Sequence, residues 1–113
     1  MADGEYRTHS LDLLTRVLAG CRDPRDLENL LREVWTPGEL RDAAQRVEVA
    51  AQLLEGSTYE MIAKLTGAST ATISRVRRGI EHGEGALEKG LLRVGRGGGG
   101  RYHRRWVAGG MLE

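Results

Sequence analysis

The sequence predicts an all-α protein, and three observations support this prediction. Apolar residues recur at intervals of three and four through residues 11–80, which is the helical period. Capping residues followed by proline and isolated glycines divide this pattern into separate segments. No segment shows the strict alternation of a strand. Because aromatic residues make up only 4% of the chain and Phe is absent, its core must consist mainly of Leu, Val, Ile and Ala.

Two helices are expected before Thr36. Residues 1–9 are polar and are predicted to be a flexible N-terminus, so that the first helix runs from Ser10 to Gly20. Asp23 and Pro24 are a strong start signal for the second helix. Its apolar face carries Leu27, Leu30, Leu31 and Val34. Both helices carry more leucine than so small a chain can bury, so we expect a second copy of the chain to cover them.

The longest helix is expected to begin at a capping box formed by Thr36 and Glu39, with Pro37 in the first turn. Gly56 is expected to end it. Its predicted buried stripe, flanked by Ala44 and Ala51, consists of Leu40, Ala43, Val47, Ala50 and Leu54. The small side chains in and beside this stripe allow neighbouring helices to pack closely.

Residues 57–80 predict a helix-turn-helix. Ser57 is the expected cap of its first helix, with Glu60 completing a capping box. Gly67 supplies the tight turn, and Ser69 caps the second helix. The predicted buried residues are Ile62 and Leu65 in the first helix, and Ile73, Val76 and Ile80 in the second.

The opposite face of the second helix is small, polar and basic, and it is predicted to bind DNA. Short hydroxyls and a methyl group can approach base edges, and arginines can reach phosphates or guanines. The candidate DNA-binding residues are Lys64, Ser69, Thr70, Ala71, Thr72, Ser74, Arg75, Arg77 and Arg78. Residues 1–66 hold 8 Lys+Arg and 12 Asp+Glu, net −4, and residues 67–113 hold 9 and 4, net +5. The positive second part favours a polyanionic partner, although a plain helical hairpin would show the same periodicity.

The C-terminal part of the chain is less regular. Residues 81–94 are the remaining candidate for a helix, with apolar side chains among charged residues and glycines. Residues 95–113 are rich in Gly and Arg and contain Tyr102 and Trp106. We predict a flexible tail there, which either binds nucleic acid through charge and stacking or has no binding role.

Several function classes are disfavoured. His9, His82 and His103 lie far apart and Cys21 is the single cysteine, so the sequence predicts no metal site and no disulfide. We find no catalytic constellation and expect no enzyme. The chain has neither a signal peptide nor an apolar run near 18 residues, which predicts a cytoplasmic, nucleoid-associated protein that does not enter membranes.

The run from Thr36 to Gly79 resembles the tryptophan repressor superfamily, and more closely its TrpR-related YerC/YecD branch. The resemblance is carried by Thr-Pro-Gly-Glu-Leu, Gln45-Arg46-Val47, Leu53-Leu54-Glu55-Gly56 and the segment from Gly67 to Arg75. It implies a six-helix TrpR-like fold that forms an intertwined homodimer. Residues 10–94 would then form the helical DNA-binding and dimerisation domain.

The resemblance also implies the position of a corepressor pocket. Thr36, Arg46 and Arg75 match residues that line the tryptophan pocket of the repressor. Val76 stands where the repressor has a glycine, and Gly79 stands where it has a serine. Since the branched side chain of Val76 should obstruct this pocket, we expect neither tryptophan nor another small corepressor as a cofactor. We interpret Arg46 as an ion-pair or phosphate-contacting residue.

These observations predict a sequence-specific, double-stranded DNA-binding transcriptional repressor. It would act as a homodimer that places two recognition helices in successive major grooves. Two alternatives remain open at this point. The protein could be an architectural nucleic-acid binder dominated by its tail, or a helical adaptor whose partner is another protein.

Overall fold

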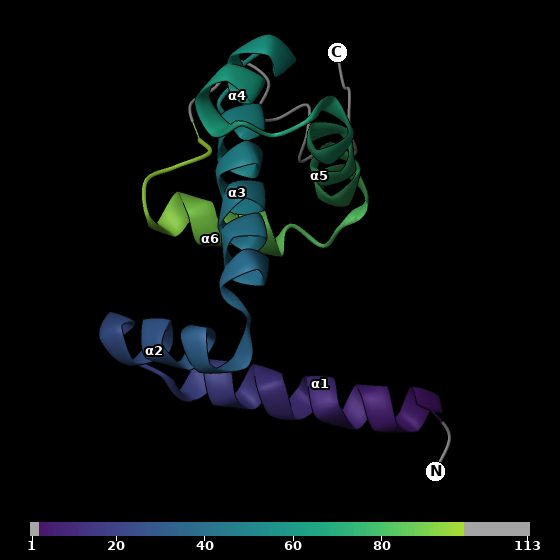
Figure 1. Ribbon diagram of the computed structural model, residues 1–113, viewed down its shortest axis with the longest axis vertical. Helices are drawn as coiled ribbons and strands as arrows, with labels where there is room; N and C mark the ends of the chain where they lie inside the picture. The colour runs from purple at the N-terminus through teal and green to yellow at the C-terminus, as the bar shows by residue number, and fades with distance from the viewer. Residues whose placement is uncertain (1–2, 99–113) are drawn as a thin grey trace. The chain divides into compact units, whose positions relative to one another are not determined.

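The computed structural model describes residues 3–98 of the chain, with side chains from residue 8 onward. This part folds into helices joined by short turns, and no strand occurs within it, as the sequence predicts (Figure 1). In chain order the helices are α1 (Asp3–Gly20), α2 (Pro24–Val34), α3 (Pro37–Leu54), α4 (Tyr59–Thr66), α5 (Thr70–His82) and α6 (Ala86–Arg93). The prediction of six helices is therefore confirmed.

The chain divides after Leu40 into two compact units. The first unit contains α1, α2 and the first turn of α3. Between residues 8 and 40 no side chain is buried, and Leu11 and Leu13 are 62% and 60% exposed. Several apolar side chains of α1 and α2 are thus exposed in this unit, and the others are only half-buried.

The starts of the first two helices differ in how well the sequence predicts them. Helix α1 begins at Asp3, so the predicted start at Ser10 is wrong, and residues 3–9 are helical instead of a flexible N-terminus. That segment contains no proline, and its one glycine lies in the first turn, so nothing prevents the helix from extending back. Helix α2 begins as predicted, with the Asp23 carboxylate accepting a hydrogen bond from the Arg25 N–H at 2.9 Å.

The predicted capping box at the start of α3 is confirmed. The Thr36 hydroxyl accepts a hydrogen bond from the Glu39 N–H at 3.1 Å. In return, the Glu39 carboxylate accepts one from the Thr36 N–H at 2.9 Å. Two backbone donors that the helix start would leave unpaired are satisfied in this way.

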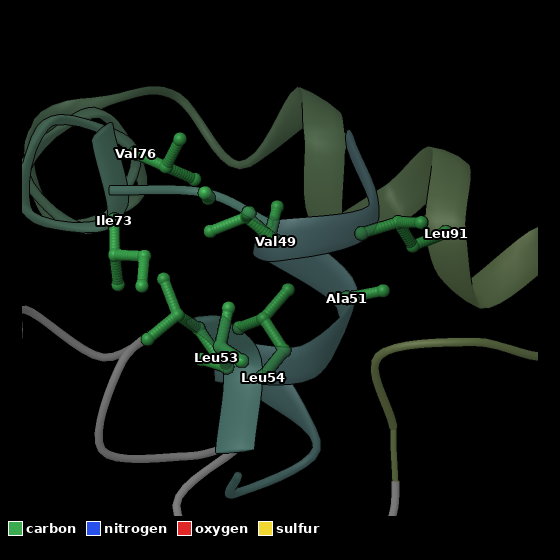
Figure 2. Close-up of a cluster of buried hydrophobic side chains, with 10 residues drawn as sticks. Val49, Ala51, Leu53, Leu54, Ile73, Val76 and Leu91 are labelled. Atoms are coloured by element: carbon green, nitrogen blue, oxygen red, sulfur yellow. The ribbon is translucent and has the colours of Figure 1, made fainter. Parts of the chain in front are cut away.

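The second unit has a small apolar core to which α3, α4, α5 and α6 all contribute. The buried residues are Val49, Ala50, Ala51, Leu53, Leu54, Ile62, Ala68, Ile73, Val76 and Leu91. Figure 2 shows Ile73 and Val76 of α5 on one side of α3, and Leu91 of α6 on the other side, near Ala51. Helix α3 is therefore the central element against which the helix-turn-helix is fixed.

The buried stripe predicted for α3 is only partly correct. Ala50 and Leu54 are buried as predicted, but Ala43 and Val47 are exposed. Val49 and Leu53, which the stripe omitted, are buried instead. The reason is that α4, α5 and α6 cover the C-terminal half of α3 from more than one side, so adjacent residues are buried rather than one helical stripe.

The folded unit continues past α6, which corrects the predicted start of the tail at residue 95. Arg96 forms ion pairs with Glu48 at 2.7 Å and with Glu55 at 2.8 Å, both on or just after α3. Gly97 is buried with φ of 76°, and an added Cβ would lie 3.3 Å from Leu91 and 3.4 Å from Leu54, so a side chain there would be both strained and crowded. Residues 99–113, the rest of the predicted tail, lie outside the described residues.

Candidate nucleic-acid interface

Helices α4 and α5 form the predicted helix-turn-helix, and hydrogen bonds hold its turn. Gly67 adopts the left-handed conformation with φ of 75°, and its N–H donates to the Ala63 carbonyl at 2.9 Å. The Thr66 hydroxyl donates to the Ile62 carbonyl at 2.7 Å and accepts from the Ala68 N–H at 3.1 Å. These contacts stabilise one turn geometry, in which only glycine is free of strain at position 67.

The turn is also attached to α3. The Gln45 side chain donates a hydrogen bond to the Thr66 carbonyl at 3.1 Å. Ala68 is buried in the core between α4 and α5. The start of α5 is thus held both by its own turn and by the long helix.

The start of α4 differs from the prediction. Thr58, and not Ser57, is the N-cap, with its hydroxyl accepting from the Met61 N–H at 3.2 Å. Ser57 instead donates its hydroxyl to the Gln52 side chain at 2.7 Å, which keeps it attached to the end of α3. The predicted burial of Leu65 is also wrong, since it is 63% exposed. In α4, Ile62 is the buried residue, and Tyr59 and Ala63 pack against the core beside it.

The N-terminus of α5 has the predicted cap. The Ser69 hydroxyl accepts from the Thr72 N–H at 3.1 Å and donates to the Thr72 hydroxyl oxygen at 3.1 Å. The Thr72 hydroxyl accepts in this contact and so retains its own hydrogen for a further partner. The positive end of the helix dipole lies beside both side chains and favours an anion such as phosphate.

The outer face of α5 brings most of the predicted residues together. Thr70, Ala71, Arg75 and Arg78 are exposed, and Ser74 is half-buried between them. Their spacing places them on one face, opposite the buried Ile73 and Val76. Within the described part of the chain neither Arg75 nor Arg78 is engaged in an ion pair. Lys64 is exposed on α4. This face combines small side chains with two cations that form no ion pair with any residue from 8 to 98.

Arg77 is engaged differently from the other two arginines of α5. Its Nε lies 3.2 Å from a carboxylate oxygen of Glu81, and its Nη1 lies 3.5 Å from the hydroxyl of Tyr59. The hydrogen bond to Tyr59 and the pairing with Glu81 raise the pKa of the guanidinium. Arg77 was predicted to bind DNA, and its link to α4 was not predicted. The i, i+4 spacing of Arg77 and Glu81 could have suggested the ion pair, whereas no local pattern points to Tyr59.

The corepressor-pocket equivalents are only partly brought together. Arg46 of α3 and Val76 and Gly79 of α5 line a cavity of about 670 Å³. Arg75 is not among its lining residues, and Thr36 is used in the cap of α3. Glu81, Glu84 and Glu88 also line the cavity, so its charged side chains are mainly acidic.

Comparison with known proteins identifies the family to which the chain belongs. Residues 9–94 match the family described as Trp repressor protein. The chain belongs to the Trp repressor protein family. Members of this family are DNA-binding transcription regulators and not enzymes. In keeping with the predicted YerC/YecD resemblance, the chain is 42% identical over 90 residues to the uncharacterized protein YerC of Bacillus subtilis, covering 80% of this chain and 86% of YerC.

Two solved structures of TrpR-like proteins share the fold. A Staphylococcus aureus protein, provisionally described as a Trp repressor, superposes with a TM-score of 0.74 at 32% identity, covering 83% of this chain and 94% of that one. A TrpR-like protein from Eubacterium eligens gives 0.75 at 34% identity, covering 82% and 96%. The prediction of a TrpR-like fold is confirmed. Among residues 3–98, no helix is both long and apolar enough to cross a membrane.

Proposed function

We propose that this protein is a sequence-specific, double-stranded DNA-binding transcription regulator, and more narrowly a repressor, that acts on the nucleoid in the cytoplasm. The observation that carries the proposal is the outer face of α5. It presents exposed small and basic side chains on a helix whose start is held by a capped turn, the buried Ala68 and a hydrogen bond from α3. A rigid helix of this kind suits insertion into a major groove.

The contacts divide into two classes. Thr70, Ala71, Thr72 and Ser74 are short enough to let the helix approach base edges, and we assign them to sequence reading. Lys64, Arg75 and Arg78 are exposed cations that would neutralise phosphates. Ser69 contributes the capped N-terminus of α5, where backbone N–H groups favour a phosphate.

The proposed working form is a homodimer. Leucine and valine side chains on α1, α2 and α3 are exposed among the residues that the structure describes. A second copy of the chain would bury them. It would also supply a second helix-turn-helix, so that two α5 helices reach half-sites one helical turn apart. Light scattering or sedimentation of the full-length chain would test this state directly.

We further propose that DNA binding does not depend on tryptophan. The branched side chain of Val76 lines the cavity where the family resemblance places room for an indole ring. Acidic side chains in the wall would also repel the carboxylate of an amino acid. An isothermal titration with tryptophan, and DNA binding with and without it, would test this proposal.

Selection of duplex sites from a random library at about 0.15 M salt tests the function as a whole, since at that ionic strength weak non-specific contacts are largely screened. We expect a two-fold symmetric site with half-sites about 34 Å apart. The variant Arg75→Glu/Arg78→Glu should lose binding. Arg22→Glu/Arg25→Glu, which makes the same charge change at two exposed arginines beside the start of α2, should retain it.

Each other outcome contradicts a specific part of the proposal. Binding without enrichment of any sequence would indicate an architectural nucleic-acid binder. Absence of any duplex binding would indicate a protein adaptor. Equal loss in Arg22→Glu/Arg25→Glu and in Arg75→Glu/Arg78→Glu would show that net charge matters and the face of α5 does not.

A further inference from the structure

The two helices of the helix-turn-helix, α4 and α5, are linked at the end opposite their turn. The turn at Gly67 joins the end of α4 to the start of α5. Tyr59 is the first residue of α4, and Arg77 lies two turns into α5. The contact between the Arg77 guanidinium and the Tyr59 hydroxyl therefore connects the parts of α4 and α5 that the turn itself does not hold.

Glu81 completes this link. Its carboxylate lies 3.2 Å from Arg77 Nε, one turn further along α5. The side chains of Arg77 and Glu81 are only 35% and 20% exposed, in contrast with the exposed Arg75 and Arg78 on the same helix. Glu81 of α5 therefore orients the guanidinium through Nε, while Nη1 is directed to Tyr59 of α4.

A connection at this position controls the tilt of α5. From Thr70 to Arg77 the helix rises roughly 10 Å, so a tilt of about 10° about the turn moves the Arg77 end by roughly 2 Å. Hydrogen bonds to base edges tolerate a spread of only about 0.5 Å in length. A small loss of constraint at Arg77 would thus affect base reading much more than the looser attraction to phosphates.

We propose that Arg77 is a positioning residue that, with Tyr59 and Glu81, holds α5 at the angle required for sequence reading and does not itself contact phosphate. The inference rests on the proposed function. It separates the three arginines of α5 into two that bind DNA, Arg75 and Arg78, and one that orients the helix carrying them.

The experiment compares Arg77→Gln and Tyr59→Phe with Arg78→Gln in the full-length protein. Arg78 is the matched control because it is the neighbouring arginine, is exposed and has no ion-pair partner in the described part of the chain. Tyr59→Phe removes one hydroxyl and leaves the ring packed against the core. Affinities for the selected site and for a scrambled duplex are measured at several salt concentrations.

We expect Arg78→Gln to weaken both duplexes and to reduce the slope of log affinity against log salt by about 0.9 per subunit. Arg77→Gln and Tyr59→Phe should leave that slope unchanged. They should lower the ratio of specific to scrambled affinity by about threefold to tenfold, as expected for the loss of one hydrogen bond of ordinary net strength. The variant Arg77→Gln/Tyr59→Phe should lose no more specificity than Arg77→Gln alone, because both changes break the same link.

A second measurement needs no DNA. Amide hydrogen exchange in α4 should be faster in Arg77→Gln and Tyr59→Phe than in the wild type, and unchanged in Arg78→Gln. Equal exchange in all four proteins overturns the link, whether or not the protein binds DNA. A reduced salt slope in Arg77→Gln also overturns it and makes Arg77 a phosphate contact. If the wild type binds no duplex while exchange responds as expected, the proposed function fails and the link between the helices stands.

Discussion

Arg96 and Glu55, which lie 41 residues apart in the sequence, are joined by two parallel hydrogen bonds. Arg96 Nε donates to one carboxylate oxygen of Glu55 at 2.8 Å, and Nη2 donates to the other at 3.2 Å. The Gly97 N–H donates to the same carboxylate at 2.8 Å. This paired geometry is the strongest form of arginine–carboxylate contact, and it attaches the segment after α6 to the end of α3.

Removal of the arginine should therefore destabilise the second unit. We expect Arg96→Ala to lower the free energy of unfolding by about 1 kcal/mol, because the three side chains are partly exposed and water screens their attraction. Arg93→Ala, an exposed arginine on α6, is the matched control and should change stability by less than about 0.5 kcal/mol. Thermal unfolding at one fixed protein concentration measures both, since association would otherwise shift the midpoint. Equal effects of the two variants would contradict this prediction.

The same cluster predicts a dependence of stability on pH. Hydrogen bonds from Arg96 lower the pKa of Glu48 and of Glu55 below the ordinary value of 4.5. These carboxylates bind fewer protons in the folded state than in the unfolded state near that pH, so their contribution is complete above about 4.5 and is lost as the pH falls through the lowered values. We expect the free energy of unfolding to fall more steeply below pH 4.5 in the wild type than in Arg96→Ala. Parallel pH profiles of the two proteins would contradict this expectation.

Two glycines should respond to alanine with opposite signs. Gly67 has φ of 75°, where a Cβ atom is strained, so Gly67→Ala should destabilise the protein by about 1 kcal/mol. Gly90 lies inside α6 with no atom within 4 Å of an added Cβ, so Gly90→Ala should stabilise it by about 0.5–1 kcal/mol. Chemical denaturation of the two variants provides the comparison. Destabilisation by Gly90→Ala would show that this site in α6 does not accept a side chain.

The exposure of apolar residues in the helix-turn-helix predicts a further contrast. Ile73 is fully buried between α5 and α3, and Ile73→Ala should cost about 2–5 kcal/mol through lost burial and a cavity. Leu65 on α4 is 63% exposed, and Leu65→Ala should cost less than about 0.5 kcal/mol. The two variants are compared by denaturant midpoints. A large cost for Leu65→Ala would mean that a second copy covers this side chain.

Local signals account for the parts of the fold that were predicted correctly. The caps at Asp23, Thr36 and Ser69 and the turn at Gly67 depend on hydrogen bonds or backbone angles within four residues, which the sequence displays directly. The α5 face of the candidate site was predicted for the same reason, because helical spacing alone places Thr70, Ala71, Ser74, Arg75 and Arg78 together.

Contacts between distant segments account for the errors. Ser57 is not the cap of α4, because its hydroxyl donates to Gln52 and Thr58 caps the helix instead. The burial of Val49 and Leu53 depends on helices that arrive from several directions, which the period of α3 cannot reveal. The predicted tail began too early because the contact of Arg96 with Glu48 spans 48 residues of sequence.

The sequence by itself determined the all-α class, the order of the helices and the identity of the face of α5 that is directed outward, because helical period and capping are properties of neighbouring residues. Only the tertiary structure decided which of the three arginines of α5 remain available to a partner. Arg75 and Arg78 are exposed, whereas Arg77 is engaged by Tyr59 and Glu81. The physical reason is that an arginine's partner is set by where other helices place their polar atoms, and that placement follows from packing of the whole unit.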